Sequence, residues 1–551
     1  MVAKFLANGR NFFLKKQTNI LSAAVVLMLA VAASRVLGLV RDRLLAGTYF
    51  IAGKEWQLDV YFAAFRLPDM LFQLLVLGAL SAAFIPVFSN IFDSDEKKAW
   101  NVASTVINIG SIVFFIVSLI ISIWAPYFCR LIAPTFSEKQ LVLMVDLTRI
   151  MMVAQLFFIV SNILTGILQS CQRFLIPALA PVVYNLGIIA GIIFLSPLVG
   201  IWGAGLGVVL GAFLHFIIQL PIAWHVGFRY KLIIDWKNDA VRKIGKLMIP
   251  RTLALAVSQI ELTVAVQIAT ALPAGSLAIF YFAQHLNDLP VGLFGLTIGQ
   301  AALPSLSVEA AKNRDNFKKI LIMSLRQILY LSLPASALLL VLRIPIVRLA
   351  FGAKTFPWQA TILTGRVVAL FALSIFAQCI TQVLIRAFYA LHDTRTPFFT
   401  AGLAVLINVG LAFLFAFGLK MEIMGLALAV SLSSISHTIL LTCLLQRRVN
   451  FATKGNFIYP IAKMFLATIL MGLALWLPMR LLDVFLLDTT KTIHLLLLTI
   501  VAVLSGMLVY LMLTYMLKIE ELGKFIQVLR RFGAWKEVLA SSSEILDSKN
   551  E

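Results

Sequence analysis

Long apolar runs separated by short polar turns recur along almost the whole chain. A membrane-spanning helix needs roughly 20 apolar residues in succession, or about 17–25 when it is tilted. Runs of that length predict about 14 transmembrane helices. The predicted spans lie near residues 21–46, 57–90, 100–128, 141–170, 175–195, 200–225, 247–271, 276–308, 318–342, 358–390, 398–418, 422–446, 457–479 and 493–517. No connection between them is long enough to fold as a soluble domain.

Composition supports the same class of protein. The chain has 551 residues, of which 61% are apolar and only 13% are charged. A soluble domain carries about 25% charged residues, and a soluble fold of this length cannot bury so much apolar surface. Intrinsic disorder and a secreted disulfide scaffold are excluded on the same grounds. The sequence therefore predicts an all-α polytopic membrane protein.

The two halves of the chain repeat each other. Ordered matches at a nearly constant offset of 222 or 223 positions include Arg173 with Arg395, Asn185 with Asn408, Gly203 with Gly425, and His215 with His437. The repeat holds about six spans, so both copies insert in the same orientation. This predicts two pseudo-symmetric six-helix lobes plus two extra C-terminal helices, the organisation of an alternating-access transporter.

This organisation gives the expected domain boundaries. A cytoplasmic N-terminal segment covers 1–20, and a basic cytoplasmic linker of 229–246 joins an N-lobe of 21–228 to a C-lobe of 247–448. The extra helices occupy 449–518, and 519–551 is predicted to be a basic amphipathic cytoplasmic tail, with a plain solvated tail as the alternative. The first apolar run resembles a signal peptide, but it continues into a charged helix and is predicted to remain uncleaved.

Positive charge dominates: 46 Lys and Arg stand against 25 Asp and Glu, a net charge of +21. Most basic residues fall in segments that alternate spans place on one side, which orients both termini toward the cytoplasm. There they face anionic membrane lipids. About ten basic residues remain at membrane depth, where each is costly. That remainder needs a partner or a function.

The first span holds the densest polar cluster. Arg35 and Asp42 are two turns apart and share a face, and Arg41 lies near that face. Asp42 could simply pair with Arg41 or Arg43. The cluster nevertheless keeps excess positive charge, and guanidinium groups match phosphate oxygens bidentately. Arg35 and Arg41 therefore predict a cationic cavity for an anionic substrate, with phosphate or pyrophosphate as the first choice.

Other polar residues extend this predicted site. Arg66 and Arg251 are further candidates for the cationic cavity, and Asp42, Asp59, Asp69 and Arg386 are candidates for gates or ion pairs. Glu261, His285 and Asp288 are candidates for coupling transport to a cation, either sodium or a proton. The alternatives are an internal arginine partner for Glu261 and a hydrogen-bonded structural role for His285.

No catalytic or metal site is predicted. The four cysteines are isolated, the six histidines are scattered, and no P-loop is present. A membrane-embedded transferase would need clustered carboxylates to hold a metal ion, and the pair Asp93 and Asp95 reads as a solvated turn. We therefore expect neither an enzyme, nor a cofactor, nor nucleic-acid binding. A non-catalytic scaffold protein stays an alternative to a transporter.

Several segments together resemble the MurJ (MviN) lipid II flippase family of the MOP exporter superfamily. They are SRVLGLVRD at 34–42, DVYFAAFRLP at 59–68, GALSAAFIP at 78–86, LPVGLFG at 289–295, LPSLS at 303–307, and RAFYA at 386–390 followed by DTRTP at 393–397. The resemblance covers the first twelve predicted helices. It implies a two-lobed carrier in the bacterial inner membrane that moves the undecaprenyl-pyrophosphate-linked peptidoglycan precursor to the outer leaflet. Arg35, Arg41 and Asp59 match family positions that line the cavity, and the extra helices resemble the family's lipid-tail groove.

This chain departs from the family at several positions. An Arg-Arg pair and a Glu are usual where Phe72, Gln73 and Leu77 stand, and His285 replaces a family arginine. Family members with a sodium site carry Asp where Ala265 stands. An exporter of another polyprenyl-pyrophosphate glycan, or another carrier of the superfamily, is therefore the alternative function. The excess of arginine argues against a carrier of cationic drugs.

Overall fold

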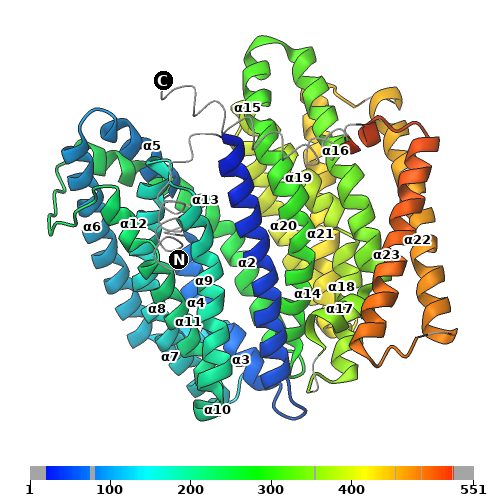
Figure 1. Ribbon diagram of the computed structural model, residues 1–551, viewed down its shortest axis with the longest axis horizontal. Helices are drawn as coiled ribbons and strands as arrows, with labels where there is room; N and C mark the ends of the chain where they lie inside the picture. The colour runs from blue at the N-terminus through cyan, green and yellow to red at the C-terminus, as the bar shows by residue number, and fades with distance from the viewer. Residues whose placement is uncertain are drawn as a thin grey trace, which may run out of the picture. The chain divides into compact units, whose positions relative to one another are not determined.

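The computed structural model describes residues 20–74, 81–352, 355–452, 454–485, 487–523 and 525–526. Every regular element in these ranges is helical (Figure 1), as the sequence predicts. Ten of the described helices are long and apolar enough to cross a membrane. A further pair, α18 (Trp358–Ala372) and α19 (Ile375–Ala390), is bent by 41° and adds an eleventh if it forms one span. The total of about 14 stays a prediction.

The first half of the chain follows the predicted order of spans, with four of them divided into shorter helical elements. Its elements are α2 (Ile20–Tyr49), α3 (Trp56–Ala64), α4 (Arg66–Phe72), α5 (Ser81–Phe92), α6 (Glu96–Ile123), α7 (Ala125–Ile132), α8 (Glu138–Ser170), α9 (Leu175–Ala190), η2 (Gly191–Leu195), α10 (Ser196–Val199), α11 (Trp202–Ile217) and α12 (Leu220–His225).

The second half repeats this order and adds two helices. Its elements are α13 (Asp239–Thr270), α14 (Ser276–Pro290), η3 (Val291–Leu296), α15 (Thr297–Lys312), α16 (Arg314–Val341), α17 (Arg343–Phe351), α18, α19, α20 (Arg395–Phe413), η4 (Leu414–Gly418), α21 (Glu422–Val449), η5 (Lys454–Ile458), α22 (Tyr459–Phe485) and α23 (Thr492–Met516).

Local geometry repeats with the sequence. The helices α9 and α20 both end in a π-helical turn, η2 and η4. A glycine of the next long helix, α11 or α21, packs against each turn: a Cβ at Gly203 would lie 2.6 Å from the Leu195 carbonyl carbon, and one at Gly425 would lie 2.6 Å from the Phe415 carbonyl carbon. No larger side chain fits at either position. The repeat seen in the sequence therefore corresponds to a repeated packing device.

Helix starts repeat in the same way. The Asp95 carboxylate accepts a hydrogen bond from the Lys98 backbone N–H at the start of α6. The side chain of Asn313 accepts from the backbone N–H groups of Asp315 and Asn316 at the start of α16. Both side chains satisfy N–H groups that the first turn of a helix leaves without partners.

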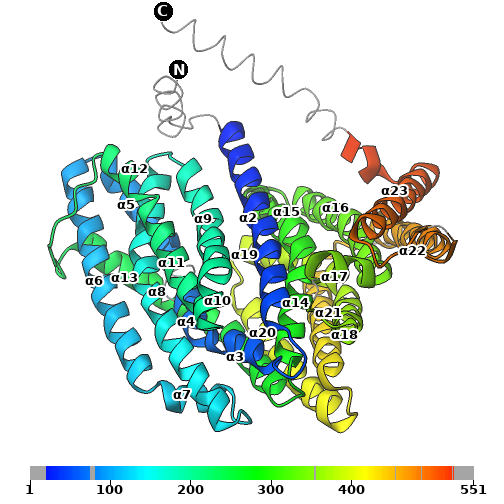
Figure 2. The ribbon, with the colours of Figure 1, turned by 60° about the horizontal axis from the view of Figure 1, so that its bottom comes forward.

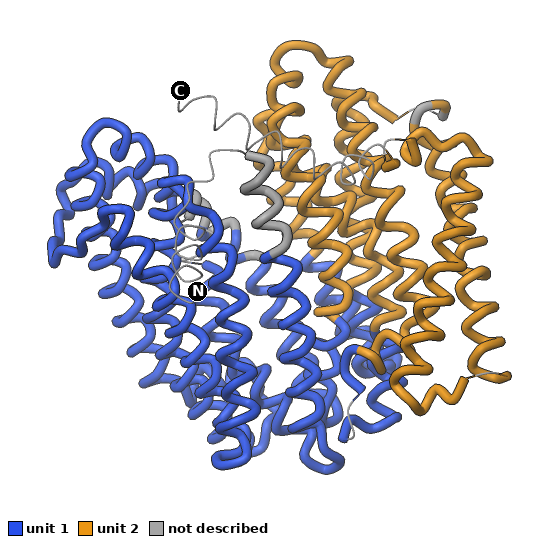
Figure 3. Tube along the Cα trace, viewed as in Figure 1, with its two compact units in different colours: residues 1–283, 350–367, 405–429 blue, residues 284–349, 368–404, 430–551 orange. Residues whose placement is uncertain are grey.

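The chain forms two compact units (Figure 3). Unit 1 comprises Met1–Ala283, Ala350–Val367 and Val405–Ala429, and unit 2 comprises Gln284–Leu349, Val368–Ala404 and Val430–Glu551. The boundaries fall within α14, α17, α18, α20 and α21, so these helices contribute to both units. The lobe boundaries expected from the sequence repeat stay a prediction. The expected N-terminal segment lies outside the described residues, apart from Ile20, as does most of the expected tail.

Within unit 2, α22 and α23 lie side by side (Figures 1 and 2). Their shared core includes Met471, Leu475 and Tyr510, and it packs against Tyr330 and Leu333 of α16. The Tyr510 hydroxyl donates a 2.8 Å hydrogen bond to the Tyr330 carbonyl. Large apolar side chains on the other faces of both helices are exposed, including Ile469, Leu473, Leu504 and Leu508. In a membrane these side chains face lipid.

A charged turn between α19 and α20 is tied to the end of α21. Asp393 forms a 2.5 Å ion pair with Arg448 and accepts hydrogen bonds from the Thr396 backbone N–H at 2.9 Å and from its hydroxyl at 2.6 Å. Burial opposes ionisation of the Asp393 carboxyl. The Thr396 hydrogen bonds and the Arg448 charge outweigh it, and the pKa of Asp393 is lowered.

Candidate functional site

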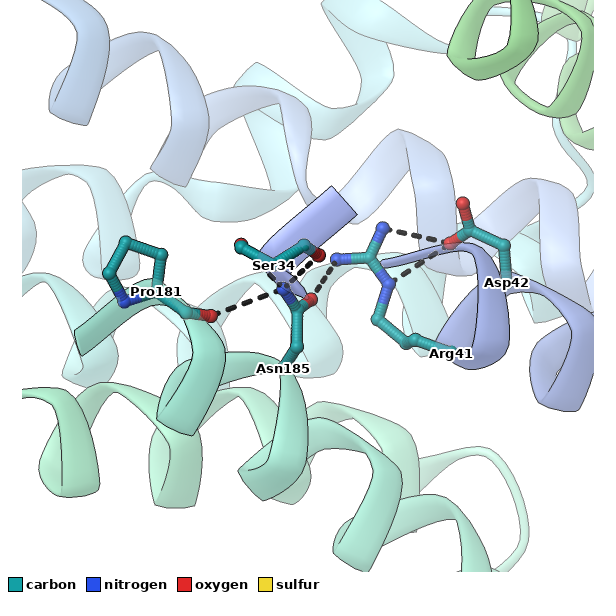
Figure 4. A network of polar contacts seen from close by, with 5 residues as sticks. All are labelled: Ser34, Arg41, Asp42, Pro181 and Asn185. Carbon is teal, nitrogen blue, oxygen red and sulfur yellow. Dashed lines mark hydrogen bonds and ion pairs between the residues drawn. The ribbon is translucent and has the colours of Figure 1, made fainter. Parts of the chain in front are cut away.

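The cluster predicted in the first span forms a connected polar network on α2 (Figure 4). Arg41 donates from Nε at 3.0 Å and from Nη2 at 2.8 Å to one oxygen of Asp42, whose side chain is only 2% exposed. Its Nη1 donates at 3.2 Å to the side-chain oxygen of Asn185 on α9. Asn185 in turn donates to the carbonyl and hydroxyl of Ser34. The network fixes the orientation of the Arg41 guanidinium.

Arg35 lies on the same helix but in a different environment. Its side chain is exposed, and it makes no hydrogen bond or ion pair within the described part of the chain. Arg41 has the predicted structural partner Asp42, whereas no described residue occupies a donor of Arg35. An unpaired guanidinium can bind an oxyanion without first breaking an internal ion pair.

Arg66 is the most enclosed of the three predicted cavity arginines whose side chains are described. Its side chain is 2% exposed. It donates to the Gln259 carbonyl at 2.6 Å, to the Gln259 side-chain oxygen at 2.9 Å and to the Thr263 hydroxyl at 3.0 Å, all on α13. Asp69, one turn further along α4, lies 3.8 Å from it. Arg66 thus joins α4 to α13, and its assignment to substrate binding stays a prediction.

Asp59 on α3 binds the start of α14. One carboxylate oxygen accepts from the Gly275 backbone N–H at 2.5 Å and the other from the Ala278 N–H at 2.9 Å. Gly275 has a φ of +89°, and a Cβ there would lie 2.8 Å from the Phe50 ring. The turn therefore requires glycine. The carboxylate satisfies N–H groups at a helix N-terminus. The gate role expected for Asp59 stays a prediction.

Asp69 also borders a cavity of about 320 Å³ within unit 1. Aromatic rings of Phe65, Phe72 and Tyr184 form much of its wall, and the Gln155 and His215 side chains add polar groups. The Gln155 side-chain oxygen is buried and has no hydrogen-bond partner among the described residues. The resemblance implies an arginine in the family at the position of Phe72, so the wall here has an aromatic ring at that position.

The predicted residues of the second half fall in two places. In unit 1, Glu261 on α13 accepts a 2.7 Å hydrogen bond from Asn408 on α20. In unit 2, His285 and Asp288 are half-buried on α14. Arg386 on α19 donates to the carbonyl and side-chain oxygen of Gln382 at 2.6 and 3.0 Å. Their roles in coupling or gating stay predictions. Arg251 lies in α13, and its side chain is outside the described residues.

Sequence reasoning missed the role of two asparagines. Asn185 joins α9 to the first helix of one half, and Asn408 joins α20 to the first helix of the other half. Their 223-residue offset was the available signal, because a polar residue kept in both copies of an apolar repeat points to a shared contact. The partners carry opposite charges: Asn185 bonds Arg41, and Asn408 bonds Glu261.

Comparison with known proteins gives consistent matches. The family model of the lipid II flippase MurJ matches residues 48–492. A probable lipid II flippase MurJ of Buchnera aphidicola is 29% identical over 485 residues, covering 85% of this chain and 91% of that protein. One of Thermotoga maritima is 29% identical over 499 residues, covering 90% and 96%.

Solved structures agree with the sequence matches. A lipid II flippase MurJ in an inward closed conformation superimposes with a TM-score of 0.74 and 26% sequence identity, covering 89% of this chain and 98% of that one. A multidrug resistance MATE family transporter of the MOP superfamily in an inward-facing conformation gives a TM-score of 0.63 at 13% identity, covering 76% and 94%. The second likeness concerns the fold alone.

Proposed function

The chain belongs to the lipid II flippase MurJ family, and on that premise we propose that it moves lipid II from the inner to the outer leaflet by alternating access. The substrate is the undecaprenyl-pyrophosphate-linked peptidoglycan precursor. The match over residues 48–492 is the observation that carries the proposal. Relatives that share this name cover most of this chain, and the matching structure covers 89% of it. The proposed role is transport and not catalysis.

The α2 arginines are the proposed binding groups for the pyrophosphate. Arg35 makes the direct contact in this proposal, because its guanidinium is exposed and without an internal partner in the described residues. Arg41 presents positive charge in a fixed orientation, held by Asp42 and Asn185. A bidentate guanidinium matches the paired oxygens of a phosphate better than a lysine would. Arg66 and Arg251 are proposed to add positive charge to the same cavity.

The lipid tail is proposed to remain in the bilayer along α22 and α23. Their exposed apolar side chains support this arrangement. The proposed location is the bacterial inner membrane with both termini in the cytoplasm, because basic residues then concentrate on the cytoplasmic side. That side also faces anionic lipid, which attracts basic segments such as the linker at 229–246.

Transport is proposed to couple to a cation, sodium or a proton. Glu261 is the first candidate, because it is a carboxylate within the apolar α13 and has a polar partner on α20. His285 and Asp288 are the further candidates, and Asp42, Asp59, Asp69 and Arg386 are proposed as gating residues. An inside-negative potential alone favours outward movement of an anionic headgroup, by about 2.3 kcal/mol per charge per 100 mV.

A second candidate function is export of another polyprenyl-pyrophosphate-linked glycan. The observation that favours it is the apolar wall around Phe72 in the unit 1 cavity, where the family usually has arginine. Such a change alters the contacts available to a headgroup but leaves the α2 arginines in place.

Depletion of the protein in a bacterium that depends on it tests the proposal. Lipid II is expected to accumulate in the inner leaflet while its synthesis continues. Normal delivery of lipid II to the outer leaflet would contradict the proposal. Binding of purified protein to lipid II and to other polyprenyl-pyrophosphate glycans separates the two candidates, since the better-bound headgroup identifies the substrate.

A further inference from the structure

A polar cavity of about 380 Å³ lies in unit 2 where α16, α22 and the end of α23 meet. It is distinct from the α2 network and from the unit 1 cavity. Its walls include Arg326 of α16, Lys463 of α22, and Lys518 and Glu520, which follow α23. Three cationic side chains from three separate segments thus converge on one cavity.

Several donors of these cations remain available. Nη1 of Arg326 and Nζ of Lys518 have no partner among the described residues. The Lys463 ammonium donates one 3.1 Å hydrogen bond to the Leu517 carbonyl at the end of α23, which leaves two of its three N–H groups. The cavity therefore presents donors from all three cations to a ligand.

Two carboxylates already bind Arg326, and they differ in burial. Glu521 is 1% exposed and lies 2.7 Å from Nε of Arg326, so it is a fixed internal counter-ion. Glu520 is 71% exposed and reaches Nη2 of Arg326 at 3.2 Å. An exposed carboxylate on a surface ion pair is held weakly. The Glu520 carboxylate therefore marks a position beside Arg326 where the oxygen of another anion can take its place.

The surroundings place this cavity at the level of lipid headgroups. Tyr459 opens α22 and Tyr515 lies near the end of α23, and both rings are exposed at the same ends of the helices as the cavity. Tyrosines collect at membrane–water interfaces. Exposed apolar side chains such as Leu466 and Met512 begin one to two turns further along each helix. A ligand of the cavity would come from the headgroup layer beside them.

We propose that this cavity binds the phosphate of an anionic phospholipid headgroup. The phosphate oxygens replace the Glu520 carboxylate at Arg326 and accept hydrogen bonds from Lys463 and Lys518, while the acyl chains lie against the exposed apolar faces of α22 and α23. The ligand is thus a membrane lipid that the protein retains and does not transport. The site is independent of which headgroup the α2 arginines bind.

The test titrates the full-length protein in neutral detergent with short-chain phosphatidylglycerol and measures binding by calorimetry. Lys463→Gln is expected to weaken binding about fivefold, because one lysine near an anionic lipid surface contributes about that factor. Lys463→Arg keeps the positive charge and should bind phosphatidylglycerol like the wild type. Glu520→Gln should strengthen binding, because it removes the competing carboxylate. Lys491→Gln, an exposed lysine in the loop between α22 and α23, is the matched control and should bind like the wild type.

Two further titrations identify the source of the phosphate. Phosphatidylcholine of the same chain length should bind more weakly than phosphatidylglycerol, and inorganic phosphate more weakly still. Equal affinities for phosphatidylglycerol and phosphatidylcholine would overturn the proposal that the site recognises an anionic headgroup. Equal affinity for inorganic phosphate would overturn the lipid as ligand. Equal weakening by Lys463→Gln and Lys491→Gln would overturn the site itself.

Discussion

Two arginines on one helix should respond differently to the same substitution. Arg35 and Arg41 both lie on α2 and both belong to the proposed pyrophosphate site. Arg35 has no internal partner in the described residues, whereas Arg41 donates two hydrogen bonds to Asp42 and one to Asn185. Arg35→Ala should therefore abolish transport without affecting stability. Arg41→Ala should reduce both.

The structure gives the size of the difference. Breaking a buried ion pair by removing one partner costs about 3–5 kcal/mol. Asp42 is buried but keeps other contacts, and 21% of the Arg41 side chain is exposed. The loss for Arg41→Ala therefore lies near the lower end, about 3 kcal/mol. An exposed side chain without partners contributes within about 0.5 kcal/mol, which is the expectation for Arg35→Ala.

Thermal unfolding of the purified variants in one detergent and at one scan rate measures this difference. The midpoint of Arg35→Ala should match that of the wild type, and the midpoint of Arg41→Ala should be several degrees lower. Adding Asp42→Ala to Arg41→Ala removes both charges and should recover much of the lost stability. Equal midpoints for the two single variants would refute the structural role given to the α2 network.

Three further predictions concern other contacts. Asp59→Ala leaves two N–H groups at the start of α14 without their acceptor. The thermal midpoint should fall by the equivalent of about 2–4 kcal/mol, and an unchanged midpoint would contradict a stabilising role of the Asp59 carboxylate. Gly203→Ala should destabilise the protein by about 1–3 kcal/mol through overpacking. Gly402 has open space around it, so Gly402→Ala should be neutral or slightly stabilising. Similar effects of the two substitutions in thermal unfolding would contradict the packing argument. Because the pKa of Asp393 is lowered in the folded protein, the unfolded chain binds a proton at this carboxylate more readily. The stability that the carboxylate contributes is therefore present at neutral pH and is lost as the pH falls through the folded-state pKa. In unfolding midpoints measured from pH 7 to pH 3, Asp393→Asn should make the loss of stability toward acid pH smaller, and an unchanged pH dependence would contradict this prediction.

Span lengths were predictable because they depend on local composition, and the repeat was predictable because matching residues recur at a nearly constant offset. The predicted run at 422–446 corresponds to α21 (Glu422–Val449), and the run at 493–517 corresponds to α23 (Thr492–Met516). Pairing of Asp42 with Arg41 was one of the alternatives that the sequence left open, and the structure shows this pair. The offset between Gly203 and Gly425 indicated the repeat, and the structure shows that both glycines pack closely against backbone.

Contacts between distant segments could not be predicted in this way. The Asp59 carboxylate binds N–H groups more than 200 positions away, and Arg66 bonds to α13 nearly as far away. In the sequence both residues looked like charges without partners. Their hydrogen-bond partners are uncharged groups, which no oppositely charged residue in the sequence reveals. The bend within the run at 358–390 was missed for a related reason, because apolar composition continues through it.

Lipid II transport in proteoliposomes tests the central claim most directly. The reconstituted wild-type protein should move fluorescent lipid II across the bilayer, and Arg35→Ala at the same reconstituted amount and thermal midpoint should not. Transport by Arg35→Ala at the wild-type rate, or no faster movement by the wild type than in protein-free vesicles, would contradict the account.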